Sequence, residues 1–175
     1  IIREWLELLG ARMPSQKVMI AIQKDILHAR ADANPLIQHD GNNIQRYRDG
    51  LYLVASKNTP DLQQITPWID KSQPLNLPAN GLLELKAAQQ GISKTVWQQN
   101  CIEVRYRQGG EKIVLPWRSG RHSLKKLYQE AGIAPWLREV LPLIYINGEL
   151  AAVAGYWVSA DFHVQDGECI NLSWH

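Results

Sequence analysis

Apolar residues at the start of the chain are spaced as on one face of an α-helix. They are Ile2, Trp5, Leu6 and Leu9. Gly10 follows them, where a residue with left-handed backbone would end the helix. The spacing therefore predicts a first helix over residues 2–9.

A second helix is predicted after Pro14, because Ser15 can accept hydrogen bonds from the free amides of its first turn. Its apolar face would contain Val18, Ile22, Ile26 and Ala29. Asn34-Pro35 ends the pattern, since a proline disfavours helical backbone at the residue before it. Two helices are thus expected to open the chain.

Short strand-like runs follow over residues 36–39, 44–48 and 51–55. Asp40-Gly41 and Asp49-Gly50 separate them, and Asp-Gly is a favoured dipeptide of tight hairpins. These residues are predicted to form a small antiparallel meander.

Residues 59–80 are predicted to form a linker, because four prolines interrupt them and each proline removes a backbone donor. Trp68 and Ile69 in its middle indicate that the linker packs on another part of the protein, since an exposed tryptophan leaves a large apolar surface in water. The linker would separate a first domain, residues 1–58, from a second domain, residues 81–175.

The second domain is predicted to be rich in strands. The candidate strands are residues 82–87, 102–107, 113–117, 143–146, 150–153 and 169–174, with hairpin turns at Gly109-Gly110 and Asn147-Gly148. Ser123 can cap a helix that Gly132 ends, and Pro135 can start a short helix that Pro142 ends. The expected fold class is α+β: a small helical domain with a short antiparallel meander, then a strand-rich C-terminal domain with one or two helices.

Composition narrows the class of protein. At 175 residues, with 45% hydrophobic and 21% charged residues, the chain can bury a core. No apolar run approaches the roughly 20 residues of a membrane span and no signal peptide is evident, so we expect a cytoplasmic protein without a membrane partner. Cys101 and Cys169 are expected to be reduced and mostly buried, and the histidines lack metal-ligand spacing, so no metal site is predicted.

Positive charge is concentrated in one segment. Between Arg105 and Lys126 there are seven lysines and arginines and one acidic residue, a net charge of +6, whereas the whole chain carries +2. Cations gathered in this way release counterions when they bind a polyanion, which gives nucleic acids a sequence-independent affinity for the protein. The segment is therefore predicted to bind the phosphate groups of RNA or DNA.

The candidate contacts within this segment form two groups. Arg105 and Arg107 are two apart on a predicted strand and would share one face, with Lys112 beside them on the partner strand. The second group lies at the predicted start of the helix after Ser123, where cations are unfavourable for the helix itself but suit an anionic ligand. It consists of Arg118, Arg121, His122, Lys125 and Lys126.

Further candidate contacts lie outside the segment. Arg46 and Arg48 would place two guanidiniums on one strand face with Tyr47 between them, which suits single-stranded loop RNA; the alternative is a solvated strand. Arg138 is a candidate contact, whereas Trp136 is assigned to packing. No nucleophile lies in a recognisable catalytic turn, so no catalytic residue is predicted.

Several motifs resemble the bacterial tRNA(Ile)-lysidine synthetase family. Those that resemble its C-terminal domain are Gly109-Gly110-Glu111, residues 120–127, Pro135-Trp136-Leu137-Arg138, Leu141-Pro142-Leu143 and Gly155. Those that resemble its substrate-recognition domain are Met13-Pro14-Ser15, Ala31-Asp32-Ala33 and Arg46-Tyr47-Arg48. The resemblance implies that residues 1–58 are the substrate-recognition domain and residues 81–175 the C-terminal tRNA-binding domain.

The resemblance also implies an activity. Members of the family join lysine to the wobble cytidine of the isoleucine tRNA with a CAU anticodon, and they use ATP. Their ATP site is a Ser-Gly-Gly-x-Asp-Ser loop in an N-terminal domain, and this loop sequence does not occur here.

We therefore expect a fragment that has no ATP domain, binds no cofactor and is inactive alone, whereas the parent enzyme would use ATP and magnesium. The start of the chain, Ile1-Ile2-Arg3, lies directly within a helical pattern, which fits that interpretation. The expected partners are the CAU isoleucine tRNA and the missing N-terminal domain, with no DNA partner.

Two alternatives remain open. The chain could be a non-catalytic RNA-binding module similar to the related domain in the β chain of phenylalanyl-tRNA synthetase, although the helical first domain and Arg46-Tyr47-Arg48 argue against it. It could also be a protein-interaction domain whose basic face binds an acidic partner. That alternative predicts weak salt dependence and no preference for tRNA.

Overall fold

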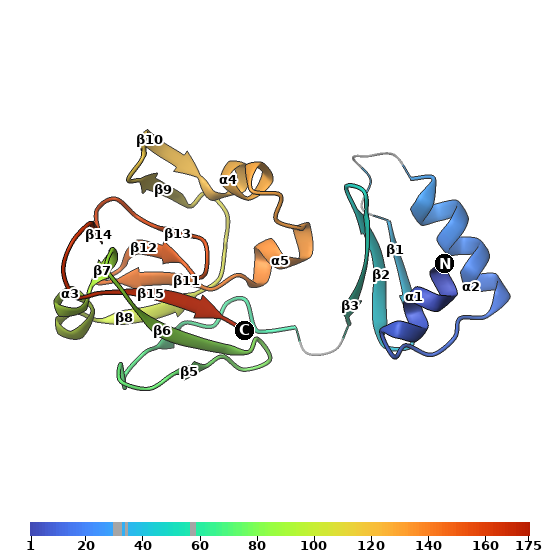
Figure 1. The fold of residues 1–175 in the computed structure, drawn as a ribbon, viewed down its shortest axis with the longest axis horizontal. Helices are drawn as coiled ribbons and strands as arrows, with labels where there is room; N and C mark the ends of the chain where they lie inside the picture. Colours follow the sequence, from blue (N-terminus) through green and yellow to red (C-terminus); the bar gives the residue numbers. More distant parts are fainter. Residues whose placement is uncertain (30–32, 34, 57–58) are drawn as a thin grey trace. The chain divides into compact units, whose positions relative to one another are not determined.

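The computed structural model describes residues 1–29, 33, 35–56 and 59–175, and the chain forms two compact units, Ile1–Asn58 and Thr59–His175 (Figure 1). The Ala31-Asp32 part of one family motif and the expected helix end at Asn34 lie outside the described residues. Within the described ranges, no helix is long and apolar enough to cross a membrane.

The first unit packs helices on one face of a three-stranded sheet (Figure 1). The helices are α1 (Ile2–Leu8), α2 (Gln16–Ala21) and the π-helical η1 (Ile22–Leu27), and the strands are β1 (Leu36–His39), β2 (Asn42–Tyr47) and β3 (Gly50–Ala55). The two predicted helix signals are confirmed, because Gly10 has φ +68° and the Ser15 hydroxyl accepts a hydrogen bond from the Val18 amide at 3.4 Å. Leu6, Ile22, Ile26 and Ile44 form the buried core of this unit.

The two hairpins of the meander use their Asp-Gly pairs differently. Asp40 and Gly41 both have positive φ, as a tight turn requires, and they join β1 to β2. In the second hairpin Tyr47 pairs with Gly50, so the turn residues are Arg48 and Asp49 and the prediction is wrong by one residue. Gly50 instead begins β3, where a Cβ atom would come within 2.9 Å of the Tyr52 ring, so the glycine serves close packing and not the turn.

The second unit contains two five-stranded sheets and a separate two-stranded sheet. In spatial order the first sheet consists of β13 (Trp157–Val158), β12 (Glu149–Val153), β11 (Leu143–Ile146), β8 (Ile102–Arg105) and β4 (Thr66–Pro67). The second consists of β14 (His163–Val164), β7 (Gly91–Ser93), β15 (Cys169–Trp174), β6 (Leu82–Ala88) and β5 (Leu75–Asn76). The two-stranded sheet pairs β9 (Lys112–Leu115) with β10 (Arg118–Ser123).

Three helices complete this unit: α3 (Lys94–Gln99), α4 (Leu124–Glu130) and α5 (Pro135–Val140). The sequence predicted the last two, with Ser123 as N-cap and Gly132 in left-handed backbone, and it missed α3. The α+β class is confirmed. Cys169 is buried, but Cys101 is exposed, so the expectation that both thiols are buried is wrong for Cys101.

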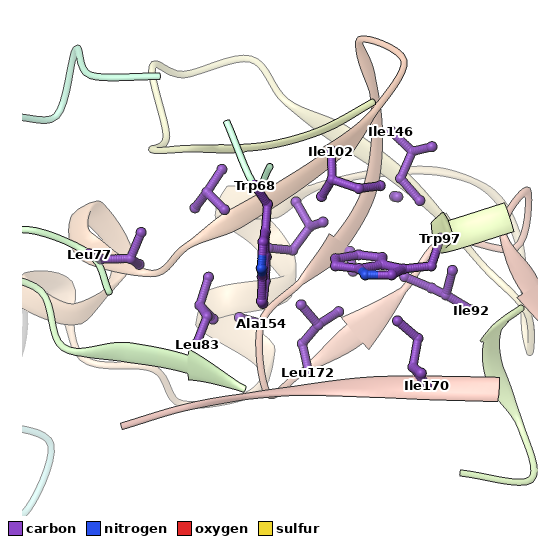
Figure 2. Close-up of a cluster of buried hydrophobic side chains, with 14 residues drawn as sticks. Trp68, Leu77, Leu83, Ile92, Trp97, Ile102, Ile146, Ala154, Ile170 and Leu172 are labelled. Carbon is purple, nitrogen blue, oxygen red and sulfur yellow. The ribbon is translucent and has the colours of Figure 1, made fainter. Parts of the chain in front are cut away.

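The main core of the second unit combines residues of both five-stranded sheets. At its centre Trp68 and Trp97 meet edge to face, with their ring centroids 5.2 Å apart (Figure 2). Ile144 and Ile146 of β11 belong to this cluster, whereas Leu143 of the same strand belongs to a second cluster with α4. The centre of the first sheet, at β11, is therefore buried on both faces.

The structure places strands where the sequence analysis expected a linker. Residues 59–80 include β4 and β5, each at the edge of a five-stranded sheet, and the Trp68 side chain is buried in the main core. Prolines are tolerated here because an edge strand does not need every backbone donor, and Pro67 lies within such a strand. This segment therefore belongs to the second compact unit.

The predicted hairpin between residues 102–107 and 113–117 is wrong. β8 pairs with β11 on one side and with β4 on the other, so neither of its edges remains for β9. The chain instead turns through Gly109 and Gly110, both with positive φ, and β9 pairs with β10. Lys112 therefore does not lie beside Arg105 on a partner strand.

Candidate nucleic-acid interface

Six of the eleven predicted contact residues lie on one structural feature, which we call the basic hairpin: β9, β10 and the first turn of α4, residues 112–126. These six are Lys112, Arg118, Arg121, His122, Lys125 and Lys126. Arg121 and His122 were expected at a helix start but lie on β10, because the Ser123 hydroxyl caps α4 by accepting a hydrogen bond from the Lys126 amide at 3.4 Å. Buried residues Ile113, Leu115, Leu124 and Leu127 anchor the hairpin to the rest of the unit.

Three cations of the basic hairpin are exposed and have no ion pair within the described part of the chain: Lys112, Arg121 and Lys125. Lys112 pairs with Ser123 and Val114 pairs with Arg121, so Lys112 and Arg121 are diagonal neighbours on one face of the two-stranded sheet. Like charges in that arrangement repel each other, and an anion bound between them would remove the repulsion. This is the part of the surface best suited to phosphate.

The other charged members of the basic hairpin are partly neutralised by one carboxylate. Arg118 donates a hydrogen bond to Glu130 at 2.7 Å, and the Lys126 ammonium lies 4.0 Å from the same carboxylate. The hydrogen bond from Arg118 holds the pKa of Glu130 below its ordinary value. These two cations are therefore less available to an external anion than Lys112, Arg121 and Lys125.

His122 serves the local fold. Its Nε2 lies 3.0 Å from the carbonyl oxygen of Ser119, and its ring is half-buried opposite Ile113. The contact spans the irregularity in β10, where the register shifts between Arg118 and Arg121 and Gly120 has positive φ. His122 thus holds the shape of the strand that presents Arg121.

Two arginines, one in the last position of β8 and one two residues after it, are already compensated. Arg105 makes a hydrogen-bonded ion pair with Glu103 at 2.5 Å, and its guanidinium lies 4.4 Å from the centroid of the Tyr145 ring. The half-buried Arg107 has its Nε 3.7 Å from the carboxylate of Glu111. The sequence counted both as available cations, but their partners reduce what they can offer to RNA.

Glu111 also holds the Gly109-Gly110 loop. Its carboxylate accepts hydrogen bonds from the backbone amides of Gln108 at 2.5 Å and Gly109 at 2.9 Å. Amides that already bind a carboxylate cannot cradle the phosphates of a nucleotide, so this loop does not fit ATP. In the part of the chain that the structure describes, no cluster of His, Cys, Asp or Glu could hold a metal ion.

The remaining candidates also take part in the folds of their units. Arg138 donates to the carbonyl of Ile133 at 2.7 Å, which ties α5 to the loop after α4. In the first unit, Arg46 donates to the carbonyl of Leu27 at 2.6 Å, at the end of η1. The expectation that Arg46 and Arg48 share a strand face is wrong, because Arg48 lies in the turn with φ +53° and its guanidinium is 5.5 Å from the Tyr47 ring centroid.

One exposed residue of the basic hairpin was missed by the sequence analysis. Trp117 lies in the two-residue turn between β9 and β10, and 67% of its surface is exposed. The sequence assigned it to the end of a strand, where an apolar residue suggests packing. The sequence signal that could have indicated an exposed turn was the Pro-Trp pair, which lies between an apolar run and a basic segment.

Comparison with known protein families identifies both units. Residues 1–52 match the model of the TilS substrate binding domain, and residues 102–174 match the model of the TilS substrate C-terminal domain. The basic hairpin lies entirely within the second match.

Curated relatives extend the similarity over nearly the whole chain. The tRNA(Ile)-lysidine synthase of Methylococcus capsulatus is 34% identical over 164 residues, which are 93% of this chain and 37% of the relative. That of Legionella pneumophila is 36% identical over 160 residues, which are 91% of this chain and 36% of the relative. That of Escherichia coli O157:H7 is 33% identical over 175 residues, which are 99% of this chain and 40% of the relative. The chain thus spans less than half the length of these relatives.

A solved structure, described as the crystal structure of the TILS C-terminal domain, is 20% identical to the chain with a TM-score of 0.47. It covers 58% of this chain, and the chain covers 90% of it. The two family models, together with relatives that align over more than nine-tenths of the chain, match the resemblance of the sequence motifs. The chain therefore belongs to the TilS family through its substrate binding domain and its substrate C-terminal domain.

Proposed function

We propose that this chain is the tRNA-binding portion of a tRNA(Ile)-lysidine synthase, and that it positions the CAU isoleucine tRNA for an ATP-using domain outside this sequence. The complete enzyme would join lysine to the wobble cytidine of that tRNA. Relatives of the chain carry the name of this enzyme, and the matched domains carry the description of substrate domains. The alternative of an unrelated RNA-binding module is not favoured by these matches.

The observation that carries the proposal is the exposed, unpaired charge of Lys112, Arg121 and Lys125 on the basic hairpin, within the described residues. Phosphate contacts of this kind supply affinity and orient an RNA, while its shape and unpaired bases supply selectivity. Arg118 and Lys126 would extend the contact where the RNA competes with Glu130. Arg105, Arg107, His122 and Arg138 would contribute through the shape of the surface more than through free charge.

The first unit would bind a second part of the same tRNA. Arg48 lies at the tip of the β2–β3 hairpin beside the Tyr47 ring, and such an arginine-aromatic pair can contact a phosphate and an unpaired base. Arg46 would support that hairpin through its hydrogen bond to Leu27. We propose that this unit contacts the anticodon arm while the basic hairpin contacts the acceptor stem.

The chemistry of the complete enzyme is assigned to residues that this sequence does not contain. ATP would supply the activation of the cytidine, with magnesium as its counter-ion. The Gly109-Gly110 loop does not fit that nucleotide, because Glu111 already accepts hydrogen bonds from the backbone amides of Gln108 and Gly109. The residues of this chain would bind and orient the RNA.

The proposal is tested by titrating the chain with CAU isoleucine tRNA and with an unrelated elongator tRNA over a range of salt concentrations. If about five phosphates are engaged, the log–log slope of the association constant against salt should be about −4 to −5. Arg121→Ala combined with Lys125→Ala should make the slope shallower by about 0.7–0.9 for each phosphate contact that is lost.

Lys86→Ala is the matched control. Lys86 is exposed on β6 of the same unit and has no ion pair within the described residues. Its substitution by alanine therefore removes one positive charge that lies outside the basic hairpin. The proposal requires tighter binding of the CAU tRNA and, for each charge removed, a larger effect from the hairpin double variant than from the control. Equal effects of the two variants, with intact circular-dichroism melts, would remove the basic hairpin from the tRNA site.

A further inference from the structure

Trp117 differs from the other tryptophans of the chain. Of the seven tryptophans, all within the described residues, it alone is exposed, whereas Trp68 and Trp97 form the centre of the main core. Its indole has no hydrogen bond and no ring contact among the described residues. A large apolar ring left in water suggests a ligand that covers it.

The turn holds Trp117 in a fixed place. Leu115 pairs with Arg118, so Pro116 and Trp117 are the two residues of the turn. Proline restricts the backbone just before the tryptophan, and Leu115 is buried in the cluster that anchors the hairpin. The indole therefore projects from a rigid base, which reduces the entropy lost when a ligand binds.

The charges on the same hairpin as the indole define the kind of ligand. Arg118 adjoins Trp117 in sequence, and Lys112 and Arg121 occupy one face of the same two-stranded sheet. An aromatic ring combined with a basic strand surface is the arrangement with which proteins bind single-stranded nucleic acid: the ring stacks on a base, and the cations follow the phosphates. Within a continuous double helix the base faces are already stacked, so the indole needs an unpaired nucleotide.

We infer that Trp117 is a stacking platform for an unpaired nucleobase of the bound RNA, while Lys112 and Arg121 hold the adjoining backbone. This inference rests on the proposed function, because it places a specific contact within the same tRNA surface. In this role the exposed indole selects a single-stranded segment of the RNA next to an RNA double helix. The stacking itself is tolerant of base identity, since every base has an aromatic face.

The test compares Trp117→Ala with Trp117→Phe, and uses Ile69→Ala as the matched control. Ile69 is another apolar residue of the second unit, 86% exposed, and it lies outside the basic hairpin. The probes are a hexamer of uridine, a blunt RNA duplex and the CAU isoleucine tRNA, each measured by fluorescence anisotropy. Trp117→Ala should weaken binding of the uridine hexamer by about 5- to 100-fold, because one base stack is lost. Trp117→Phe should retain most of the affinity, and Ile69→Ala should change nothing.

The duplex separates stacking from a general loss of affinity. The blunt duplex should bind Trp117→Ala and the wild-type chain equally well. An equal loss for hexamer and duplex, or no loss for either, would overturn the inference. No loss for either RNA would indicate that the indole contacts a protein and not a nucleobase.

The inference can fail separately from the proposed function. If the Arg121 and Lys125 double variant loses tRNA affinity while Trp117→Ala does not, only the stacking platform is refuted. If the wild-type chain binds no RNA at low salt, the proposed function and the inference fall together. A circular-dichroism melt of each variant checks folding. If the alanine variant unfolds, Trp117→Leu, which keeps an apolar side chain but cannot stack, takes its place, and it should lose affinity for the uridine hexamer while Trp117→Phe does not.

Discussion

Two parts of the same basic segment use their cations in opposite ways. On the basic hairpin, Lys112, Arg121 and Lys125 project into solvent without an ion pair among the described residues. At the end of β8 and just beyond it, Arg105 and Arg107 are paired with Glu103 and Glu111, and Arg105 also lies against Tyr145. The first group keeps its charge available for a ligand, whereas the second group uses its charge within the fold.

The difference shows why a count of charges overstates a binding surface. The net charge of +6 between Arg105 and Lys126 omits Glu103, which lies just before the segment, and Glu130, which lies just after it. Glu103 shares one face of β8 with Arg105, and the position of α4 brings Glu130 onto Arg118. The number of cations free to bind phosphate is therefore smaller than the sequence indicates.

The largest expected effect comes from removing the half-buried cation, Arg107→Ala. Its loss leaves the carboxylate of Glu111, only 10% exposed, without its positive partner, which should lower the free energy of unfolding by about 1–3 kcal/mol. Urea unfolding measures this change. Arg121→Ala, measured alongside, should leave the urea midpoint where it is in the wild-type chain. A stable Arg107→Ala variant with weakened tRNA binding would show that Arg107 serves RNA binding and not the fold, which would contradict the comparison.

Tyr128 links the basic hairpin to the internally paired arginines. It belongs to α4, whose first turn is part of the hairpin, and it is close enough to Arg107 and Glu111 to interact with their charges. Its hydroxyl is buried and has no hydrogen-bond partner among the residues that the structure describes. Tyr128→Phe removes that unsatisfied group and should raise the free energy of unfolding by about 1 kcal/mol at neutral pH. A lower urea midpoint would mean that the hydroxyl has a stabilising partner, such as a bound water.

The same tyrosine gives the stability an alkaline limit. Burial raises the pKa of Tyr128 above its ordinary value of 10.0, so the folded state disfavours its ionisation. Below pH 10 the tyrosine is neutral in both states and its contribution is complete; above that pH it ionises in the unfolded state first and stability falls. Thermal melts between pH 9 and pH 11 should show a steeper loss for the wild-type chain than for Tyr128→Phe. Parallel curves would refute the assignment.

Arg105→Ala tests the other arginine whose charge is used within the fold. The variant loses the contact with the Tyr145 ring, which should cost about 0.5–1 kcal/mol of stability. Because Arg105 is already paired with Glu103, the salt dependence of tRNA binding should keep its wild-type slope. A slope reduced as much as in Arg121→Ala would show that Arg105 leaves Glu103 to bind phosphate.

The smallest effect is expected from Glu130→Gln, which removes the carboxylate that neutralises part of the basic hairpin. Arg118 and Lys126 would then become available, and the salt slope should steepen by about 0.7–0.9 for each new phosphate contact. The pKa of Glu130 is lowered in the folded chain, so its ion pair stabilises the fold above pH 4.5 and is lost as pH falls through the lowered pKa. The stability difference between variant and wild type should therefore vanish in acid.

The sequence predicted local structure well where a single residue determines the backbone. Gly10, Ser15, Ser123 and Gly132 each act at the helix end where the pattern placed them. The Asn147-Gly148 hairpin also forms, because both residues adopt positive φ and Ile146 pairs with Glu149. These signals are local, so tertiary contacts have little opportunity to override them.

The failures concern which strands become neighbours. Nothing in the local composition of residues 102–107 indicates that β11, about forty residues later, would take the edge of β8 that β9 was expected to fill. The same missing information placed Lys112 beside Arg105 instead of diagonally across from Arg121. Candidate cations were therefore recognised by type, while their pairing partners depended on the fold.

The position of β15 has a consequence for the order in which the protein can be built. β15 lies at the centre of the second sheet, between β7 and β6, yet the ribosome makes it after both of these partners. The meander of the first unit closes between consecutive strands, so it can fold early during translation. The second unit must wait with β6 and β7 unjoined until residues 169–174 emerge, and over that interval the strand edges that β15 later covers stay open to incorrect pairing.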